Sequence, residues 1–233
     1  MERNRIFFKG NPYPKGHLIK KFVWCAHLET GNEDKEDGLY FDFHLETDNY
    51  HAEDGLNKDN SEEPESDWVA KIAWENFHRC TISSTEWHFG GFKVADEKNK
   101  INLQKLAGKV FLADTPPIDM EGDYENRAFH IYLLGHDACA DHHINFKEKN
   151  NDGSYNLEWA GKIALAYIGD HDLKYEFEAF IENAKFDEIE IQSNIPLEQS
   201  LEKLSTYIEN FENFNIEEIV LSNGHRKYKL RFL

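Results

Sequence analysis

The sequence contains few cysteines and no long apolar run. Its 233 residues include 3 Cys, 2 Met and 6 Pro, and the cysteines are Cys25, Cys80 and Cys139. An odd number of widely spaced cysteines argues against a disulfide framework and favours a reducing compartment. No stretch approaches the roughly 18 to 20 apolar residues of a membrane helix, and the first 16 residues lack a signal-peptide core. We therefore expect a soluble, cytoplasmic protein that does not contact membranes.

The common catalytic signatures are also missing. The chain has no G-x-S-x-G, G-x-x-x-x-G-K-[ST], G-x-G-x-x-G or H-E-x-x-H pattern, which are the usual signals of hydrolases, nucleotide-binding proteins and zinc proteases. Cys25 and Cys80 lie in apolar stretches, where a buried and unreactive thiol is the usual state. The 44 acidic residues offer too many carboxylate pairs to single one out for catalysis. The sequence thus favours a non-enzymatic protein.

Positive charge is scarce. The chain has 26 Lys and Arg against 44 Asp and Glu, a net charge of -18, which disfavours nucleic acid as a partner and favours a basic protein. We expect an acidic binding module, such as an inhibitor or a toxin-immunity-type protein. The acids predicted to meet the partner are Glu53, Asp54, Asp59, Glu62, Glu63, Glu65 and Asp67 in a loop at about 48–67, then Asp170, Asp172, Asp187, Glu188 and Glu190.

Aromatic residues, in contrast, are abundant and follow strand periodicity. Aromatics make up 14% of the chain. Apolar residues alternate with polar ones in residues 39–46, 159–167 and 173–182. This pattern is typical of antiparallel strands with one buried and one solvent-exposed face. Apolar residues recur at helical spacing from Leu197 to Phe211, with Asn194 as the expected cap. Asn223 and Gly224 then predict a tight hairpin between two C-terminal strands.

Two segments of the chain resemble each other. DWVAKIAWENF around Trp68 matches EWAGKIALAYI around Trp159 at four identical positions, which predicts corresponding strands in two tandem copies. The expected fold is α+β, mainly antiparallel sheet, with two copies of a multi-strand meander that each carry a packed helix. The predicted ranges are an N-terminal segment 1–16, a first copy 17–113, a linker 114–126 and a second copy 127–233.

One polar stretch, HDACADHH, suggests a different function. Its candidate metal ligands are His136, Asp137, Cys139, Asp141, His142 and His143, residue types that bind zinc. We expect the stretch at a connection between strands, with His142 on the face of Ile144 and Phe146 and His143 on the opposite face. The alternative hypotheses are therefore a zinc-dependent enzyme that uses this cluster, and a small-ligand protein with a cleft between the two copies.

Overall fold

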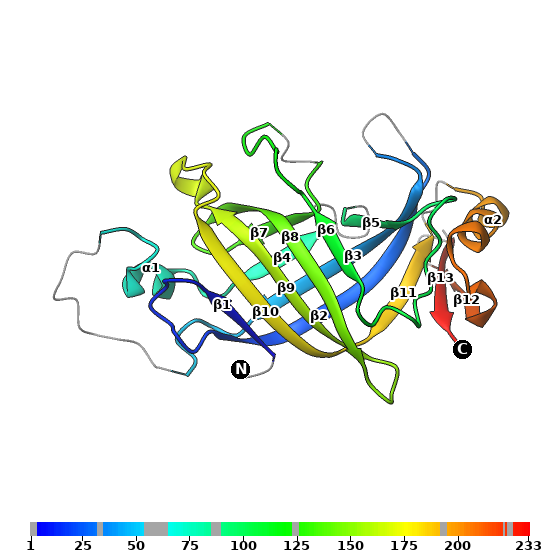
Figure 1. The fold of residues 1–233 in the computed structure, drawn as a ribbon, viewed down its shortest axis with the longest axis horizontal. Helices are drawn as coiled ribbons and strands as arrows, with labels where there is room; N and C mark the ends of the chain where they lie inside the picture. Colours follow the sequence, from blue (N-terminus) through cyan, green and yellow to red (C-terminus); the bar gives the residue numbers. More distant parts are fainter. Residues whose placement is uncertain are drawn as a thin grey trace.

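Eight antiparallel strands close into a barrel in the computed structural model (Figure 1). The ring runs β1-β2-β3-β4-β7-β8-β9-β10 and closes where β10 pairs with β1. Successive strands of the ring follow the order of the chain, so this is an up-and-down barrel. The structure describes residues 4–31, 35–53, 65–84, 90–122, 126–191, 195–220, 222 and 226–233.

The elements have the following bounds. The ring consists of β1 (Arg5–Phe8), β2 (His17–Glu29), β3 (Gly38–Thr47), β4 (Thr81–Ser84), β7 (Phe129–Tyr132), β8 (His136–Lys149), β9 (Tyr155–Ala164) and β10 (Tyr175–Ala184). Outside the ring lie β5 (Phe92–Ala95), β6 (Val110–Ala113), β11 (Phe186–Ile191), β12 (Phe214–Val220) and β13 (Arg226–Phe232). The helices are α1 (Lys71–Asn76) and α2 (Leu197–Tyr207), with 3-10 turns η2 (Ala166–Ile168) and η3 (Phe211–Asn213). No helix in these described ranges is long and apolar enough to cross a membrane.

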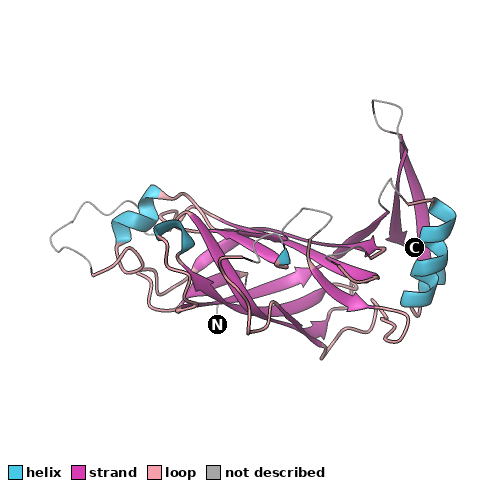
Figure 2. Cartoon of the chain, turned by 90° about the horizontal axis from the view of Figure 1, so that it is seen from above, coloured by secondary structure: helices cyan, strands magenta, loops and turns pink. Residues whose placement is uncertain are grey.

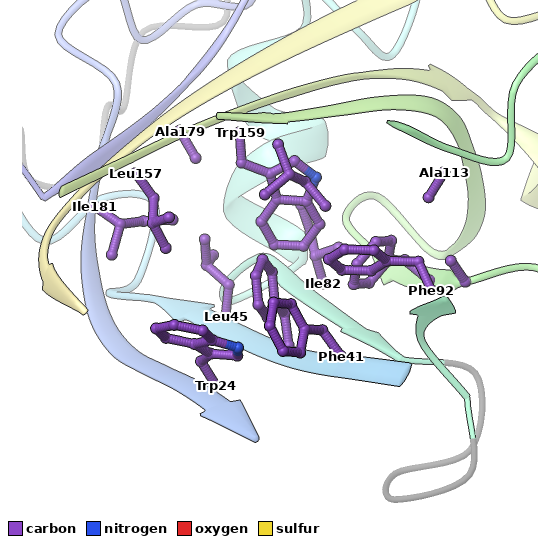
Figure 3. Close-up of a cluster of buried hydrophobic side chains, with 14 of the residues drawn as sticks. Trp24, Phe41, Leu45, Ile82, Phe92, Ala113, Leu157, Trp159, Ala179 and Ile181 are labelled. Atoms are coloured by element: carbon purple, nitrogen blue, oxygen red, sulfur yellow. The ribbon is translucent and has the colours of Figure 1, made fainter. Parts of the chain in front are cut away.

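Alternating residues fill the barrel with apolar side chains. The inward residues of β3 are Leu39, Phe41, Phe43 and Leu45, all fully buried. Figure 3 shows side chains from opposite walls pointing toward one another, Trp24 and Phe41 from one side and Trp159 from the other. The ring centroids of Trp24 and Phe41 are 5.2 Å apart, and those of Phe43 and Trp159 are 5.6 Å apart. The lumen is thus a packed aromatic core, as expected for a barrel of this size.

A second aromatic cluster closes the end of the barrel near α1. Trp74 of α1 is fully buried, and its ring lies 5.0 Å from that of Tyr50 and 5.3 Å from that of Phe8. His17 stacks on Trp74 at 5.8 Å, and Trp74 Nε1 donates to the Trp68 carbonyl at 2.9 Å. These contacts join the end of β1 and the beginning of β2 to the segment between β3 and β4.

The last part of the chain extends the sheet beyond the barrel. β11 pairs in parallel with the second half of β2, where Ile189 lies opposite Ala26. β13 pairs with β11, and β12 pairs with β13, both antiparallel. α2 lies beside this hairpin, at the opposite end of the molecule from α1 (Figure 2).

The expected fold class is wrong. Strands β2 to β4 come from the first predicted copy and β7 to β10 from the second, and together with β1 they form one closed barrel. The described residues contain two α-helices, both short. Half of this ring would leave a concave apolar face that only the other half can cover, so two separate meanders are not stable units. Residues 101–113 of the first copy, which would have to match α2 of the second, contain no helix, and Ile101 forms a single bridge to Ile208.

The two similar segments do not occupy equivalent places. The segment with Trp159 lies in β9, as predicted, but residues 71–76 form α1 rather than a strand. Trp74 is buried, whereas Ile72 is 48% exposed, so the period-two pattern expected around Trp68 does not hold. Packing in the aromatic end cluster decides the local conformation here and overrides sequence periodicity.

Several other predictions are confirmed. The alternating residues of 39–46 lie in β3, and those of 173–182 lie in β10 from Tyr175 onward, with Phe177, Ala179 and Ile181 buried. The helical spacing after Leu197 corresponds to α2, which ends at Tyr207 and begins after Pro196. The C-terminal hairpin forms from β12 and β13. The predicted cap and turn residues, 194, 223 and 224, lie outside the described residues.

Candidate functional site

The C-terminal hairpin places a strand edge at the surface. β12 pairs with β13 along its whole length, from Phe214 opposite Phe232 to Val220 opposite Arg226. It is the last strand in the sheet order, and among the described residues no strand pairs with its other side. The backbone N–H and C=O groups on such an edge can pair with another chain.

A ladder of ion pairs lies on one face of this hairpin. The basic residues Lys227, Lys229 and Arg231 alternate along β13. Lys227 pairs with Glu190 of β11, and Lys229 pairs with Glu188. Arg231 also contacts Glu188, at 2.8 Å, and this hydrogen bond raises the pKa of Arg231. The basic residues of β13 are therefore largely neutralised inside the sheet.

Acids outnumber bases on the surface around β12. The exposed acids of residues 197–220 are Glu198, Glu202, Glu209, Glu212, Glu217 and Glu218. Glu217 contacts Arg231 at 3.2 Å, and Asp37 holds Lys203 at 2.8 Å, which raises the pKa of Lys203. In 195–220 and 226–233, every basic side chain that the structure describes has an acidic partner. The surface that remains carries surplus negative charge.

Two apolar side chains on the edge strand are also exposed. Ile216 is 49% exposed and Val220 is 67% exposed, and both lie on the same face of β12 as Glu218. Antiparallel pairing of β12 with a second copy about its central residue would bring Glu217 opposite Glu217 of that copy, which is unfavourable. The edge therefore suits a different chain, with basic residues, better than a copy of itself.

A second polar arrangement occupies a groove on the outer wall of the barrel. The groove encloses about 520 Å³ and is lined by residues of β2, β3, β4, β11 and β13. His44 lies between Ser83 and Glu46: its Nδ1 is 3.2 Å from Ser83 Oγ and its Nε2 is 2.5 Å from Glu46 Oε1. A hydroxyl, an imidazole and a carboxylate in this order resemble the catalytic triad of serine hydrolases.

The surroundings of His44 do not complete a hydrolase site. Ser83 lies opposite His44 on one side and His130 on the other, so its backbone amide belongs to the sheet rather than to an oxyanion hole. Glu46 also contacts Lys21 at 3.4 Å, and its pKa is lowered, chiefly by the hydrogen bond with His44. The arrangement therefore fits a cross-strand polar network.

HDACADHH lies at the beginning of β8 rather than at a connection between strands. Asp141 has a φ of 54°, and the register of β8 against β9 shifts between Ala140 and His143, which marks a β-bulge. The bulge turns His142 inward with Ile144, while His143 is exposed. The predicted separation of these two histidines onto opposite faces is therefore confirmed.

The six candidate metal ligands fall on both sides of the barrel wall. The buried members are Asp137, Cys139 and His142, and the others are His136, Asp141 and His143. In the part of the chain that the structure describes, no three His, Cys, Asp or Glu residues are placed to hold a metal ion. Burial also raises the pKa of Cys139 well above its ordinary value, which favours the thiol over the metal-binding thiolate. The geometry does not favour the zinc hypothesis.

His142 instead belongs to the core. It is 0% exposed, and its Nδ1 accepts a hydrogen bond from Trp159 Nε1 at 3.3 Å. A Cβ on Gly161 would lie 2.7 Å from this Nδ1, so only glycine allows the close approach. Burial lowers the pKa of His142 to about 3. It also raises to about 6 the pKa of Asp114, whose Oδ2 lies 3.8 Å from His142 Nε2.

The acids predicted to meet a partner are scattered. Asp54, Asp59, Glu62 and Glu63 lie outside the described residues. The exposed ones are Glu53, Glu65, Asp67, Asp172 and Asp187, and Asp170 is half-buried. Glu188 and Glu190 are only 3% and 5% exposed and lie in the ion-pair ladder. These two acids stabilise the hairpin and present little surface to a partner.

Sequence reasoning missed the acids around β12. The stretch FNIEEIV was correctly predicted as a strand of the terminal hairpin, and its two adjacent glutamates lie between apolar residues. The sequence did not show that this strand lies at the edge of the sheet. Its position there depends on the pairing of β11 with β2, two strands that are far apart in the sequence.

Comparison of the chain with protein-family models, characterised proteins and solved structures gives no match. A function must therefore be argued from the geometry of the described residues.

Proposed function

We propose that the protein binds a basic protein partner, and that the partner adds an extended segment to the open edge of β12. The observation that carries this proposal is the combination, on one edge strand, of exposed Ile216 and Val220 with the acids Glu217 and Glu218. In strand addition, backbone hydrogen bonds provide affinity and alternate side chains provide specificity. Lys or Arg on the added segment would match the acidic side chains of β12.

The overall charge supports the same proposal at longer range. A net charge of -18 steers a basic partner toward the protein and raises the association rate at low salt. Inhibitors and toxin-neutralising immunity proteins use association of this kind, and we propose that class for this chain. The acidic surface guides the encounter, and β12 holds the partner.

Selection of displayed random peptides on the immobilised protein tests the proposal without knowledge of the natural partner. Peptides of about seven residues match the 7 residues of β12 and are long enough for strand addition. We expect enrichment of Lys or Arg alternating with Val, Ile or Thr, because such segments favour strands and complement acids.

Two variants with the same change in net charge serve as test and control. Glu217→Gln combined with Glu218→Gln is expected to bind the enriched peptides more weakly. Glu121→Gln combined with Glu148→Gln, which neutralises two exposed acids elsewhere, is expected to keep them. Enrichment of neutral or acidic peptides, or equal binding to both variants, would contradict the proposal.

A further inference from the structure

A cleft lies on the surface formed by the paired strands β1 and β10 and the turn after β1. In Figure 1, β1 lies toward the end of the molecule opposite to β12. It encloses about 400 Å³ and is lined by residues of β1, of the turn that follows β1, and of β10. This volume lies in the range of small-molecule sites. Because β1 belongs to the N-terminal segment, the cleft is not the one expected between residues 17–113 and 127–233.

The turn that forms one wall of the cleft is held firmly. Trp68 Nε1 donates to the carbonyl of Lys9 at 2.9 Å. Asn11 Oδ1 accepts from the Tyr13 amide at 3.1 Å, and the Gly16 amide donates to the Tyr13 carbonyl at 2.9 Å. Gly16 has a φ of 67°, which glycine adopts without strain. The wall is therefore formed before any ligand arrives, which lowers the entropic cost of binding.

The lining is mainly apolar and aromatic. Its apolar members are Phe7, Phe8, Tyr13, Pro14 and Phe177. Phe8, Tyr13 and Phe177 are almost fully buried, whereas Phe7 is half-buried on the outer face. The half-buried Phe7 and the exposed Pro14 therefore provide the contact area for a flat apolar group.

The charged residues of the cleft are unbalanced. Lys9 pairs with Glu176 at 2.9 Å, and this hydrogen bond is the main cause of the raised pKa of Lys9, to which Glu178 also contributes. Glu178 is exposed and has no ion pair of its own among the described residues. Two carboxylates thus share one ammonium group, which leaves about one unit of negative charge at the cleft.

From this combination we propose that the cleft binds a small organic cation that carries an aromatic ring and a primary amine. The ring lies against Phe7 and Pro14, and the amine pairs with Glu178. The half-buried ring of Phe7 adds a favourable interaction with the cation. This site is independent of strand addition at β12.

Titration with phenethylamine, followed by two-dimensional amide NMR, tests this site. We expect shifts of the amides of residues 9–16 and a dissociation constant of about 1 mM or lower. The matched anion 3-phenylpropionate is expected to bind at least about tenfold more weakly, because the amine makes a charge-assisted contact that the anion lacks.

Substitutions at two exposed residues of the cleft are expected to change the affinity for phenethylamine in opposite directions. Glu178→Gln is expected to weaken phenethylamine binding about tenfold. Lys9→Gln removes the competing ammonium group and is expected to strengthen it, while Glu148→Gln, on β8, should leave it unchanged. Absence of shifts in residues 9–16 at about 10 mM amine, equal binding of the anion, or a Lys9→Gln variant that binds more weakly would overturn the proposal.

Discussion

The barrel interior and the C-terminal hairpin use the same strand alternation but differ in what covers them. In β3 the apolar residues face other strands of a closed ring and are fully buried, whereas Ile216 and Val220 of β12 remain 49% and 67% exposed. A closed ring has no edge, and the hairpin ends in one. We infer that stability resides mainly in the barrel and binding mainly at the hairpin.

A pair of truncations tests this division most strongly. Trp159→Ala should lower the free energy of unfolding by about 3 to 5 kcal/mol, because Trp159 is 1% exposed and its ring centroid lies 4.6 Å from that of Phe129. Val220→Ala should change it by less than about 0.5 kcal/mol. Urea denaturation at equilibrium measures both. Similar losses at the two positions would show that the hairpin is part of the stabilising core.

Low pH is expected to destabilise the folded protein through protonation of His142. Its pKa in the folded protein, about 3, lies below the ordinary value of 6.5. Its contribution to the free energy of unfolding is therefore fully present above pH 6.5 and is lost as the pH falls toward 3. Between pH 7 and pH 4 this loss is about 3 kcal/mol. His142→Gln keeps an acceptor for the Trp159 N–H and removes the titration. The stability advantage of the wild type over the variant should therefore shrink by this amount.

Protonation of Asp114 has the opposite effect on the stability of the folded protein. Its folded pKa of about 6 is above the ordinary 3.8, so protonation below pH 6 favours the folded state. Asp114 is present in both proteins, as is His17, whose pKa is lowered to about 4 by burial, so both largely cancel in the comparison. Parallel stability curves for the wild type and His142→Gln would show that His142 is not a buried neutral imidazole.

A smaller effect is expected at the hairpin, on association rate rather than on stability. With a selected basic peptide, Glu217→Gln combined with Glu218→Gln should slow association several-fold at about 50 mM salt and much less at about 500 mM, where charges are screened. Stopped-flow fluorescence measures the rate, and unfolding free energy should remain within about 0.5 kcal/mol. A rate change that does not depend on salt would contradict electrostatic steering.

The sequence contains enough information to identify most strands but not the barrel. Alternating residues in β3, β9 and β10 report which face is buried, and this information is local. Closure depends on β10 pairing with β1 across more than 170 positions, from Phe180 to Arg5, and local periodicity does not encode it. The repeated residues around Trp68 and Trp159 misled the prediction because α1 is set by packing against Tyr50 and Phe8.

The candidate site could be predicted even less well. The separation of His142 from His143 followed from strand geometry, but the bulge at Asp141 that places His142 inside the barrel was not visible. Acids such as Glu188 and Glu190 were indistinguishable from surface acids until β13 supplied their partners. Position in the sheet, rather than residue type, separates buried acids from exposed ones.

Amide hydrogen exchange of β12 with and without a saturating selected peptide tests the central claim most directly. Strand addition predicts that alternate β12 amides, those that point away from β13, exchange at least about tenfold more slowly in the complex. Unchanged exchange throughout β12, with protection elsewhere on the molecule, would contradict the account and place the partner on another surface.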